Sequence, residues 1–275
     1  MNIHRPSNDV LATRGGLHVR LSRSPREVAI AQTLRFQVFY EERNAVADEI
    51  SSKLSLDADR YDAFCEHLIV VRQTASVADG RFHVSDGEVV GTYRLLRQSV
   101  ATENGGFYTQ GEFDVAPLLA AKPDLNFLEL GRSCVLKPYR TKPVVELLWQ
   151  GIWNYVRSYR LDVMIGCASL EGANPLEHEA TLNFLATQCA APEEWNVRAL
   201  PGRYIAMKSA AGTTFDSKSV LKALPPLIKG YLRLGCYIGE GAVVDSQFNT
   251  TDVLVILPVA NINPRYFAHF GNPND

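Results

Sequence analysis

Segments with the periodicity of β-strands alternate with segments with the periodicity of α-helices along most of this chain. Apolar residues recur at every second position in a strand and at every third or fourth position in a helix. Alternation predicts a strand at residues 17–21, and short segments that are largely apolar are expected to be strands at residues 67–71, 89–96, 127–136, 163–168, 204–208 and 252–258. Helices are expected at residues 25–42, 143–158, 175–187 and 224–234. This alternation predicts an α/β protein in which helices cover a sheet.

The chain shows no internal repeat and no clear linker. Its 275 residues are many for one ordinary domain and few for two. Residues 1–16 are polar and are expected to form a flexible N-terminal tail. Residues 17–275 are expected to form a single domain with a C-terminal elaboration from about residue 213.

Composition excludes several classes of protein. The net charge of -2 offers no general attraction for nucleic acid. The 5 cysteines are scattered and form no C-x-x-C pair, which favours reduced thiols over disulfides or a zinc site, and no metal is expected. The N-terminus lacks an apolar signal segment, and the apolar run at residues 253–260 is too short to span a bilayer. We therefore expect a cytoplasmic protein.

Several charged residues lie inside segments that are expected to be buried. Arg35 interrupts the apolar face of the first helix, Arg94 interrupts a strand, and Glu129 and Arg132 share another strand. Such groups need an ionic partner or a ligand, because burying a lone charge is unfavourable. A bulge at Gly131 would bring Glu129 and Arg132 to one face of the sheet. Two interpretations of these charges stay open, a polar cleft that they line and a structural network of ion pairs.

Two further groups of charges border these segments. Asp59 and Asp62 precede the strand at residues 67–71, where they could bind a cation, bind Arg35 or form a turn. Three cations precede the helix at residues 143–158, namely Lys137, Arg140 and Lys142. A helix N-terminus attracts anions, so these cations predict either a bound anion or a solvated basic turn. No phosphate-binding glycine loop and no serine-nucleophile motif is present.

Taken together, the segments at residues 34–39, 59–70, 90–96, 128–135, 224–235 and 252–270 resemble the N-acyltransferases of ornithine lipid synthesis, some of which are labelled hemolysin-like. These are members of the GNAT superfamily and are similar to acyl-homoserine lactone synthases. The resemblance implies a GNAT fold, in which α/β/α layers surround a mixed, splayed sheet. It also implies transfer of a 3-hydroxyacyl group from acyl carrier protein to the α-amine of L-ornithine, giving lyso-ornithine lipid.

The resemblance also implies cofactors, partners and residue roles. No cofactor is bound permanently, and phosphopantetheine arrives on the acyl carrier protein. The usual glycine-bearing loop for coenzyme A is replaced here by residues 140–145, which suits a carrier protein better. The inner membrane surface and the O-acyltransferase of the next step are further expected partners, and nucleic acid is not.

The expected roles divide the charged residues into three sets. Glu129 and Arg132 are expected to be catalytic, with Glu129 accepting the amine proton and the backbone near Arg132 stabilising the oxyanion. The expected substrate-binding residues are Arg35, Asp59, Asp62 and Arg94. The expected carrier-protein contacts are Lys137, Arg140 and Lys142. Two alternatives remain, an acyl-homoserine lactone synthase-like enzyme that uses S-adenosylmethionine and a non-catalytic acyl-carrier or lipid-binding module.

Overall fold

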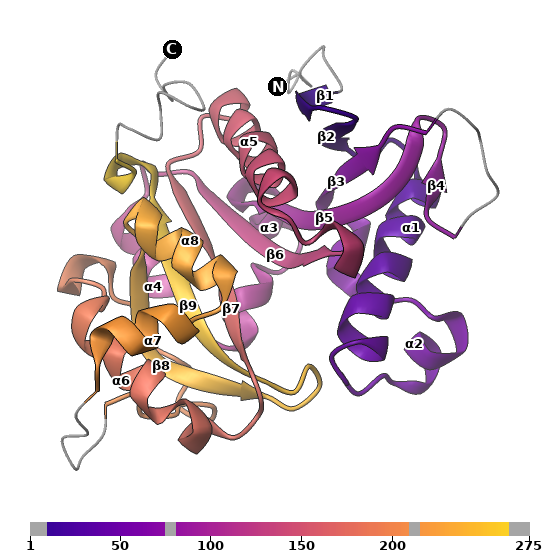
Figure 1. Cartoon of the computed structure of the whole chain (residues 1–275). Coiled ribbons are helices and arrows are strands. Elements are labelled where there is room, and N and C mark those ends of the chain that lie inside the picture. The colour runs from indigo at the N-terminus through magenta and orange to yellow at the C-terminus, as the bar shows by residue number, and fades with distance from the viewer. Residues whose placement is uncertain (1–9, 75–80, 209–214, 264–275) are drawn as a thin grey trace. The chain divides into compact units, whose positions relative to one another are not determined.

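A computed structural model describes residues 10–74, 81–208 and 215–263 (Figure 1). Within it the chain divides into two compact units. The first unit contains the described residues up to Leu96 together with Leu130–Arg160, and the second contains Arg97–Glu129 and the described residues from Leu161 onward. Each unit is therefore built from segments that are separated in the sequence, although a single domain was expected from residue 17.

The first unit is built on a largely antiparallel sheet. Its strands follow the order β1-β2-β3-β5-β6, with β4 beside β5. Antiparallel pairing joins β1 to β2, β2 to β3, β3 to β5 and β4 to β5. The strands expected near residues 67–71 and 89–96 are thus direct antiparallel neighbours. The strand bounds are β1 Val10–Arg14, β2 Leu17–Leu21, β3 Glu66–Arg72, β4 His83–Val84, β5 Gly87–Arg97 and β6 Phe127–Val135, of which β6 continues from the second unit.

Two helices cover opposite faces of this sheet. Helix α1, Pro25–Phe36, packs with Ile69 and Val71 of β3 in one apolar cluster. Helix α5, Lys142–Ser158, approaches the other face so closely that a Cβ on Gly151 would lie 2.9 Å from Val19 of β2. Neighbouring residues of a strand point to opposite faces. Since helices cover both faces here, the centre of β3 is apolar at every position. The expected α/β layers are confirmed.

Helix α1 begins with a side-chain cap. Ser24 accepts a hydrogen bond from the backbone N–H of Glu27, and Pro25 occupies the first turn. The helix continues as a π-helix over Gln37–Glu41, so the expected extent to about residue 42 is confirmed. The polar excursion that follows contains α2, Glu49–Leu54, and a 3-10 turn, Arg60–Ala63.

The second unit is built on a mixed sheet whose strands follow the order β6-β7-β9-β8. The first residues of β6 pair in parallel with β7, whereas β9 runs antiparallel to both β7 and β8. The further strand bounds are β7 Val163–Glu171, β8 Tyr237–Asp245 and β9 Thr250–Pro258. The helices are α3 Gln98–Glu103, α4 Ala116–Ala121, α6 Glu179–Gln188, α7 Ser217–Ala223 and α8 Pro226–Leu234 (Figure 1).

Three expectations need correction. Val10–Arg14, assigned to a flexible tail, forms β1 through hydrogen bonds to β2, and residues 1–9 lie outside the described residues. Residues 204–208 form no strand but a single bridge, between Ile205 and Ala242. The region after about residue 213, a boundary outside the described residues, is integral to the sheet, because it supplies β8 and β9. No helix in the described part of the chain is long and apolar enough to cross a bilayer.

Candidate functional site

A cluster of arginines and aspartates lies in the first unit. Its arginines come from the last turn of α1, from β5 and from β6, and its aspartates come from the segment that ends in the 3-10 turn Arg60–Ala63. The members of this arginine–aspartate cluster are Arg35, Asp57, Asp59, Asp62, Arg94 and Arg132. Arg35 lies beside Asp62, which is one of the partners expected for it, and Arg94 and Arg132 both contact Asp59.

Arg35 occupies the centre of this cluster. Its Nη1 and Nη2 atoms donate to the two carboxylate oxygens of Asp62 at 2.9 and 2.7 Å, and its Nε atom lies 2.8 Å from Oδ2 of Asp57. The side chain of Arg35 is only 1% exposed. Burial disfavours its charge, but the neighbouring Asp57 and Asp62 carboxylates still raise the pKa of Arg35. Burial likewise opposes the Asp62 anion, yet hydrogen bonds from Arg35 hold the pKa of Asp62 well below its ordinary value.

Asp59 links the other two arginines. Arg94 Nη1 donates to Oδ1 of Asp59 at 2.7 Å, and Arg132 Nη2 donates to Oδ2 at 3.2 Å. Asp59 and Arg132 have 24% and 13% of their side chains exposed, more than the other members of the cluster. The three guanidinium and three carboxylate charges therefore neutralise one another, as a structural ion-pair network does.

The backbone of β6 is irregular at Arg132, whose φ is 52°. This left-handed conformation is uncommon for a residue with a side chain. A bulge was expected at Gly131, and the irregular residue is instead the next one. Residues 131–133 are only partly buried although their neighbours at 127–130 are fully buried.

Glu129 lies in the second unit, in a cradle formed by the 3-10 turn Tyr108–Gly111. Its Oε2 atom accepts the backbone N–H of Tyr108 at 2.9 Å, and Oε1 accepts that of Thr109 at 2.6 Å. The hydroxyl of Thr109 also donates to Oε1. Glu129 is 5% exposed and Thr109 is 1% exposed, so this contact is shielded from water. The carboxylate is thus held in one orientation, as a general base requires.

The expected basic residues lie at the start of α5, where all three are exposed. Arg140 is engaged within the chain, since its Nε atom donates to the carbonyl of Val135 at 2.9 Å and its Nη2 atom pairs with Glu42. Lys142, with 86% of its side chain exposed, lies 3.5 Å from Glu146. Lys137 and Lys142 therefore present more charge to a partner than Arg140 does.

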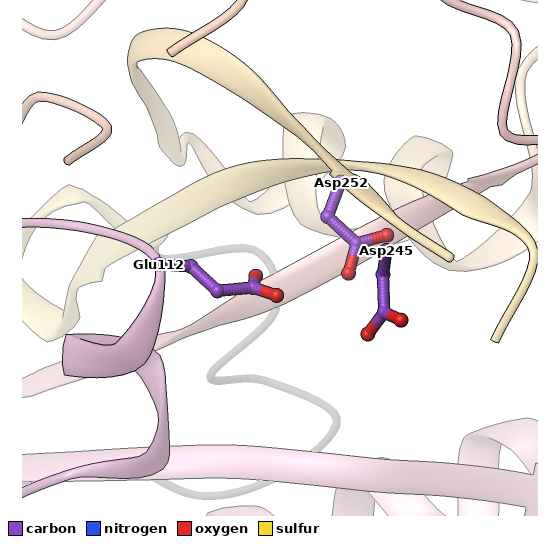
Figure 2. Close-up of side chains that lie close together, drawn as sticks. All are labelled: Glu112, Asp245 and Asp252. Carbon is purple, nitrogen blue, oxygen red and sulfur yellow. The ribbon is translucent and has the colours of Figure 1, made fainter. Parts of the chain in front are cut away.

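Sequence reasoning missed an acidic cluster in the second unit, formed by Glu112, Asp245 and Asp252. Each offers a carboxylate oxygen, and these oxygens all lie within 4.8 Å of one another. Figure 2 shows Glu112 extending from the turn after residue 111 toward the two aspartates of the sheet. Burial and the nearby Glu112 raise the pKa of Asp252 to about 7. A cation of either kind, an ammonium or a metal ion, would suit this acidic cluster.

All five cysteines are free thiols, as expected. Burial raises the pKa of Cys134 and of Cys236 to about 12. Burial, together with Glu112, also raises the pKa of Cys167 well above its ordinary value. These thiols stay protonated near neutral pH, so they do not suit nucleophilic catalysis.

Comparisons with known proteins identify the family. A family model described as "Acetyltransferase (GNAT) domain" matches residues 34–150. An L-ornithine N(alpha)-acyltransferase from Brucella abortus is 47% identical over 95% of this chain and 91% of its own length. The chain belongs to the L-ornithine N(alpha)-acyltransferase family. Proteins of the same name from Agrobacterium fabrum and Rhizobium meliloti are 48% and 46% identical, covering 94% and 97% of this chain and 86% and 88% of their own lengths.

Membership of the L-ornithine N(alpha)-acyltransferase family confirms the resemblance and the GNAT-like fold. The GNAT match at residues 34–150 includes the whole arginine–aspartate cluster, Glu129 and the basic turn before α5. Asp245 and Asp252 lie outside that match, on the two strands that close the sheet of the second unit.

Proposed function

We propose that this protein acylates the α-amine of L-ornithine with a 3-hydroxyacyl group taken from acyl carrier protein, giving lyso-ornithine lipid. The observation that carries the proposal is the 46% to 48% identity, over nearly the whole chain, to proteins named L-ornithine N(alpha)-acyltransferase. The same identity favours this enzyme over an acyl-homoserine lactone synthase or a binding module.

The reaction is the aminolysis of a thioester. The neutral α-amine attacks the thioester carbonyl carbon, so that a C–N bond forms and the C–S bond breaks. The phosphopantetheine sulfur leaves as a thiolate, and the proton lost by the amine passes to a base and finally to this sulfur or to water. The α-amine is mostly protonated at pH 7 and cannot attack in that form, so a positioned base that removes the proton raises the rate.

Glu129 is the base in this proposal. Its carboxylate is buried and oriented by two backbone N–H groups and a threonine hydroxyl. Arg132 contributes through its unusual backbone, because a residue with φ of 52° turns its peptide groups out of the regular ladder. An N–H freed in this way is suited to stabilising the oxyanion of the tetrahedral intermediate.

The arginine–aspartate cluster has a structural role and a substrate-facing side. Arg35 and Asp62 satisfy each other almost completely, so we assign them to holding α1 and the 3-10 turn in place. Asp59 and Arg132 form the less buried side, and Arg94 is buried beside them. Arg132 and Asp59 are its most exposed members and are the proposed substrate contacts.

The donor is an acyl group on a carrier protein. Carrier proteins are acidic, and the exposed lysines Lys137 and Lys142 offer them a basic surface beside Arg140. The first turn of α5 adds the partial positive charge of a helix N-terminus, which suits the single phosphate of phosphopantetheine. Phosphopantetheine is a part of the substrate in this proposal, and no resident cofactor is required.

Expression of this chain in a host without ornithine lipids tests the proposal. Mass spectrometry of the extracted lipids is expected to show lyso-ornithine lipid with the wild type and not with Glu129→Gln. Accumulation of an acyl-homoserine lactone, or of no new acylated amine although the protein is soluble and folded, contradicts it.

A further inference from the structure

The second unit holds a buried excess of negative charge. Asp252 is 6% exposed, Asp245 is 9% exposed and Glu112 is 3% exposed. Within the described ranges no basic side chain lies within 4.0 Å of the carboxylates of Asp245 or Asp252, while Glu112 pairs with Arg203 at 3.3 Å. A buried carboxylate needs a cation, hydrogen-bond donors or a proton to offset the loss of its hydration.

One carboxylate oxygen of Asp252 lacks a hydrogen-bond donor in the described part of the chain, although the hydroxyls of Thr250 and Ser169 lie near this side chain and favour its charged form. Among the residues that the structure describes, Oδ1 of Asp252 has no hydrogen-bond partner. By contrast, Asp245 is held by its turn, since its Oδ1 accepts the backbone N–H groups of Gln247 and Phe248 at 2.8 and 3.0 Å. Figure 2 shows the Asp252 carboxyl beside that of Asp245, with Glu112 extending toward both. The buried Oδ1 atom of Asp252, which accepts no hydrogen bond from the described residues, is therefore a position at which a cation with N–H donors could bind.

The acidic cluster shares a face of the sheet with Glu129. Asp252 lies opposite Ser169, and Ile256 lies opposite Ile165, which in turn pairs with Glu129. Residues paired in this way point to the same face, and so do residues separated by an even number of positions along a strand. Glu129 and Asp252 thus lie on one face of the same sheet.

Cys167 lies between these two carboxylates. Its sulfur is 3.9 Å from the hydroxyl of Thr109, which donates to Glu129. The negative charges of Glu112, Asp252 and Glu129 add to burial in raising the pKa of the Cys167 thiol. The turn that cradles Glu129 also ends at Glu112, so one short segment positions the proposed base and one wall of the acidic cluster.

This face is accessible at its far end. Ser169, directly opposite Asp252, is exposed. A Cβ built on Gly111, next to Glu112, would meet no atom within 4 Å. Exposed residues therefore border the acidic cluster, at Gly111 and at Ser169.

We propose that Glu112, Asp245 and Asp252 bind the side-chain ammonium of the acceptor amino acid. This inference rests on the proposed function, which supplies an acceptor with an amine at each end. An ammonium has three N–H donors, and the cluster offers one oxygen from each of three carboxyl groups. Asp59 and Asp62 were also expected to be able to bind a cation, but arginines already neutralise their charges. The acidic cluster thus selects a diamino acid over a neutral one.

L-Norvaline provides the matching probe, because it has the carbon chain of L-ornithine without the side-chain amine. Acylation of each amino acid is followed by mass spectrometry, using the acyl donor on which the wild type is active. The wild type is expected to prefer L-ornithine in kcat/KM by roughly 100-fold or more, since a site built for a polar group rejects the analogue that lacks it. Absence of L-ornithine acylation by the wild type would refute the proposed function itself, separately from this inference.

Asp252→Asn and Asp245→Asn remove one charge each while keeping the shape of the side chain. Each is expected to lower kcat/KM for L-ornithine by about 30-fold and to leave kcat/KM for L-norvaline nearly unchanged. Glu103→Gln, at an exposed acid of the same unit, is the matched control and is expected to change neither value. Thermal unfolding confirms that the variants are folded, and either aspartate variant suffices if the other is not.

Two outcomes overturn the inference. An equal loss with both amino acids in both variants shows that the cluster only supports the fold. In the second outcome, EDTA abolishes the activity of the wild type, Mn²⁺ or Ca²⁺ restores it, and the activity of Asp252→Asn does not respond to these ions. This result shows that the cluster binds a metal ion instead of the ammonium.

Discussion

Arg35 and Asp62 form a two-point ion pair in which both Nη atoms of the guanidinium meet both oxygens of the carboxylate, at 2.9 and 2.7 Å. The pair is almost completely buried. It joins the last turn of α1 to the 3-10 turn Arg60–Ala63 and is extended by Arg94, which lies 3.2 Å from Asp62. Its geometry allows the structural and the substrate-binding interpretations of this pair to be separated.

Asp62→Asn tests that separation. The substitution leaves the buried cluster with three guanidinium groups and only two carboxylates, of which Asp57 still contacts Arg35, and we expect the free energy of unfolding to fall by about 3 kcal/mol in urea denaturation. The folded enzyme is expected to keep its KM for L-ornithine. Glu49→Gln, in the exposed pair with Lys53, is the matched control and is expected to leave the urea midpoint unchanged. A large rise in KM with little loss of stability would assign Asp62 to substrate binding.

Glu129→Gln removes the proposed base and keeps the shape of the side chain. Turnover is expected to fall by about 100-fold or more, because proton transfer by a positioned group contributes that much or more. Binding of the acyl donor, measured by calorimetry, is expected to persist. Thr109→Val removes one donor of the cradle and is expected to reduce turnover less, whereas Thr109→Ser restores it. A folded Glu129→Gln enzyme with near-normal turnover rules out Glu129 as the base.

The basic turn before α5 is tested by charge reversal. Lys137→Glu combined with Lys142→Glu is expected to raise the KM for acyl carrier protein about 10-fold at low salt and to leave the KM for L-ornithine unchanged. The effect is expected to shrink near 0.5 M salt, since exposed charges are screened at short range there. Lys218→Glu combined with Lys222→Glu carries the same charge change on α7, and no effect on the carrier KM is expected. Equal efficiency of the wild type with free acyl-coenzyme A argues against a carrier-bound donor.

His67 confers a pH dependence on stability. Burial, reinforced by the Arg35 charge, lowers the pKa of His67 to about 4. The unfolded chain therefore binds a proton at His67 below about pH 6.5 while the folded chain does not, so this histidine makes stability fall as the pH drops from 6.5 to 4. The loss amounts to about 3 kcal/mol at most. Urea unfolding at both pH values is expected to show a smaller difference in His67→Gln than in the wild type, and equal differences would contradict this role.

Much of the first unit follows from local patterns. Alternating apolar residues predict β2, largely apolar segments of strand length predict β3 and β5, and the Ser24 cap with Pro25 predicts the start of α1. Arg35 and Asp62 could be paired in advance because a charge on an apolar helix face requires a partner of opposite sign. The strand β1 escaped prediction, since its residues are only partly buried and alternate weakly.

The second unit shows where sequence patterns fail. Strand β8 carries Gly239 and Gly241, and the latter has a φ of 87°, which interrupts the alternation and shifts the register with β9. No element was expected between residues 234 and 252, so Asp245 stood in an unassigned segment and Asp252 at the start of the strand expected at residues 252–258. Their proximity to Glu112 depends on β8 and β9 pairing and on the turn at residues 108–111, and no spacing along the chain encodes that contact.

Reconstitution with purified components tests the central claim most directly. The wild-type chain is incubated with 3-hydroxyacyl-acyl carrier protein and L-ornithine labelled with ¹⁵N at the α-amine only, and the product is fragmented in a mass spectrometer. The account predicts an amide on the labelled nitrogen, formed in equal amount with the free thiol of the carrier protein and lost in Glu129→Gln. An amide on the unlabelled side-chain nitrogen, or no amide from a folded wild type, would contradict it.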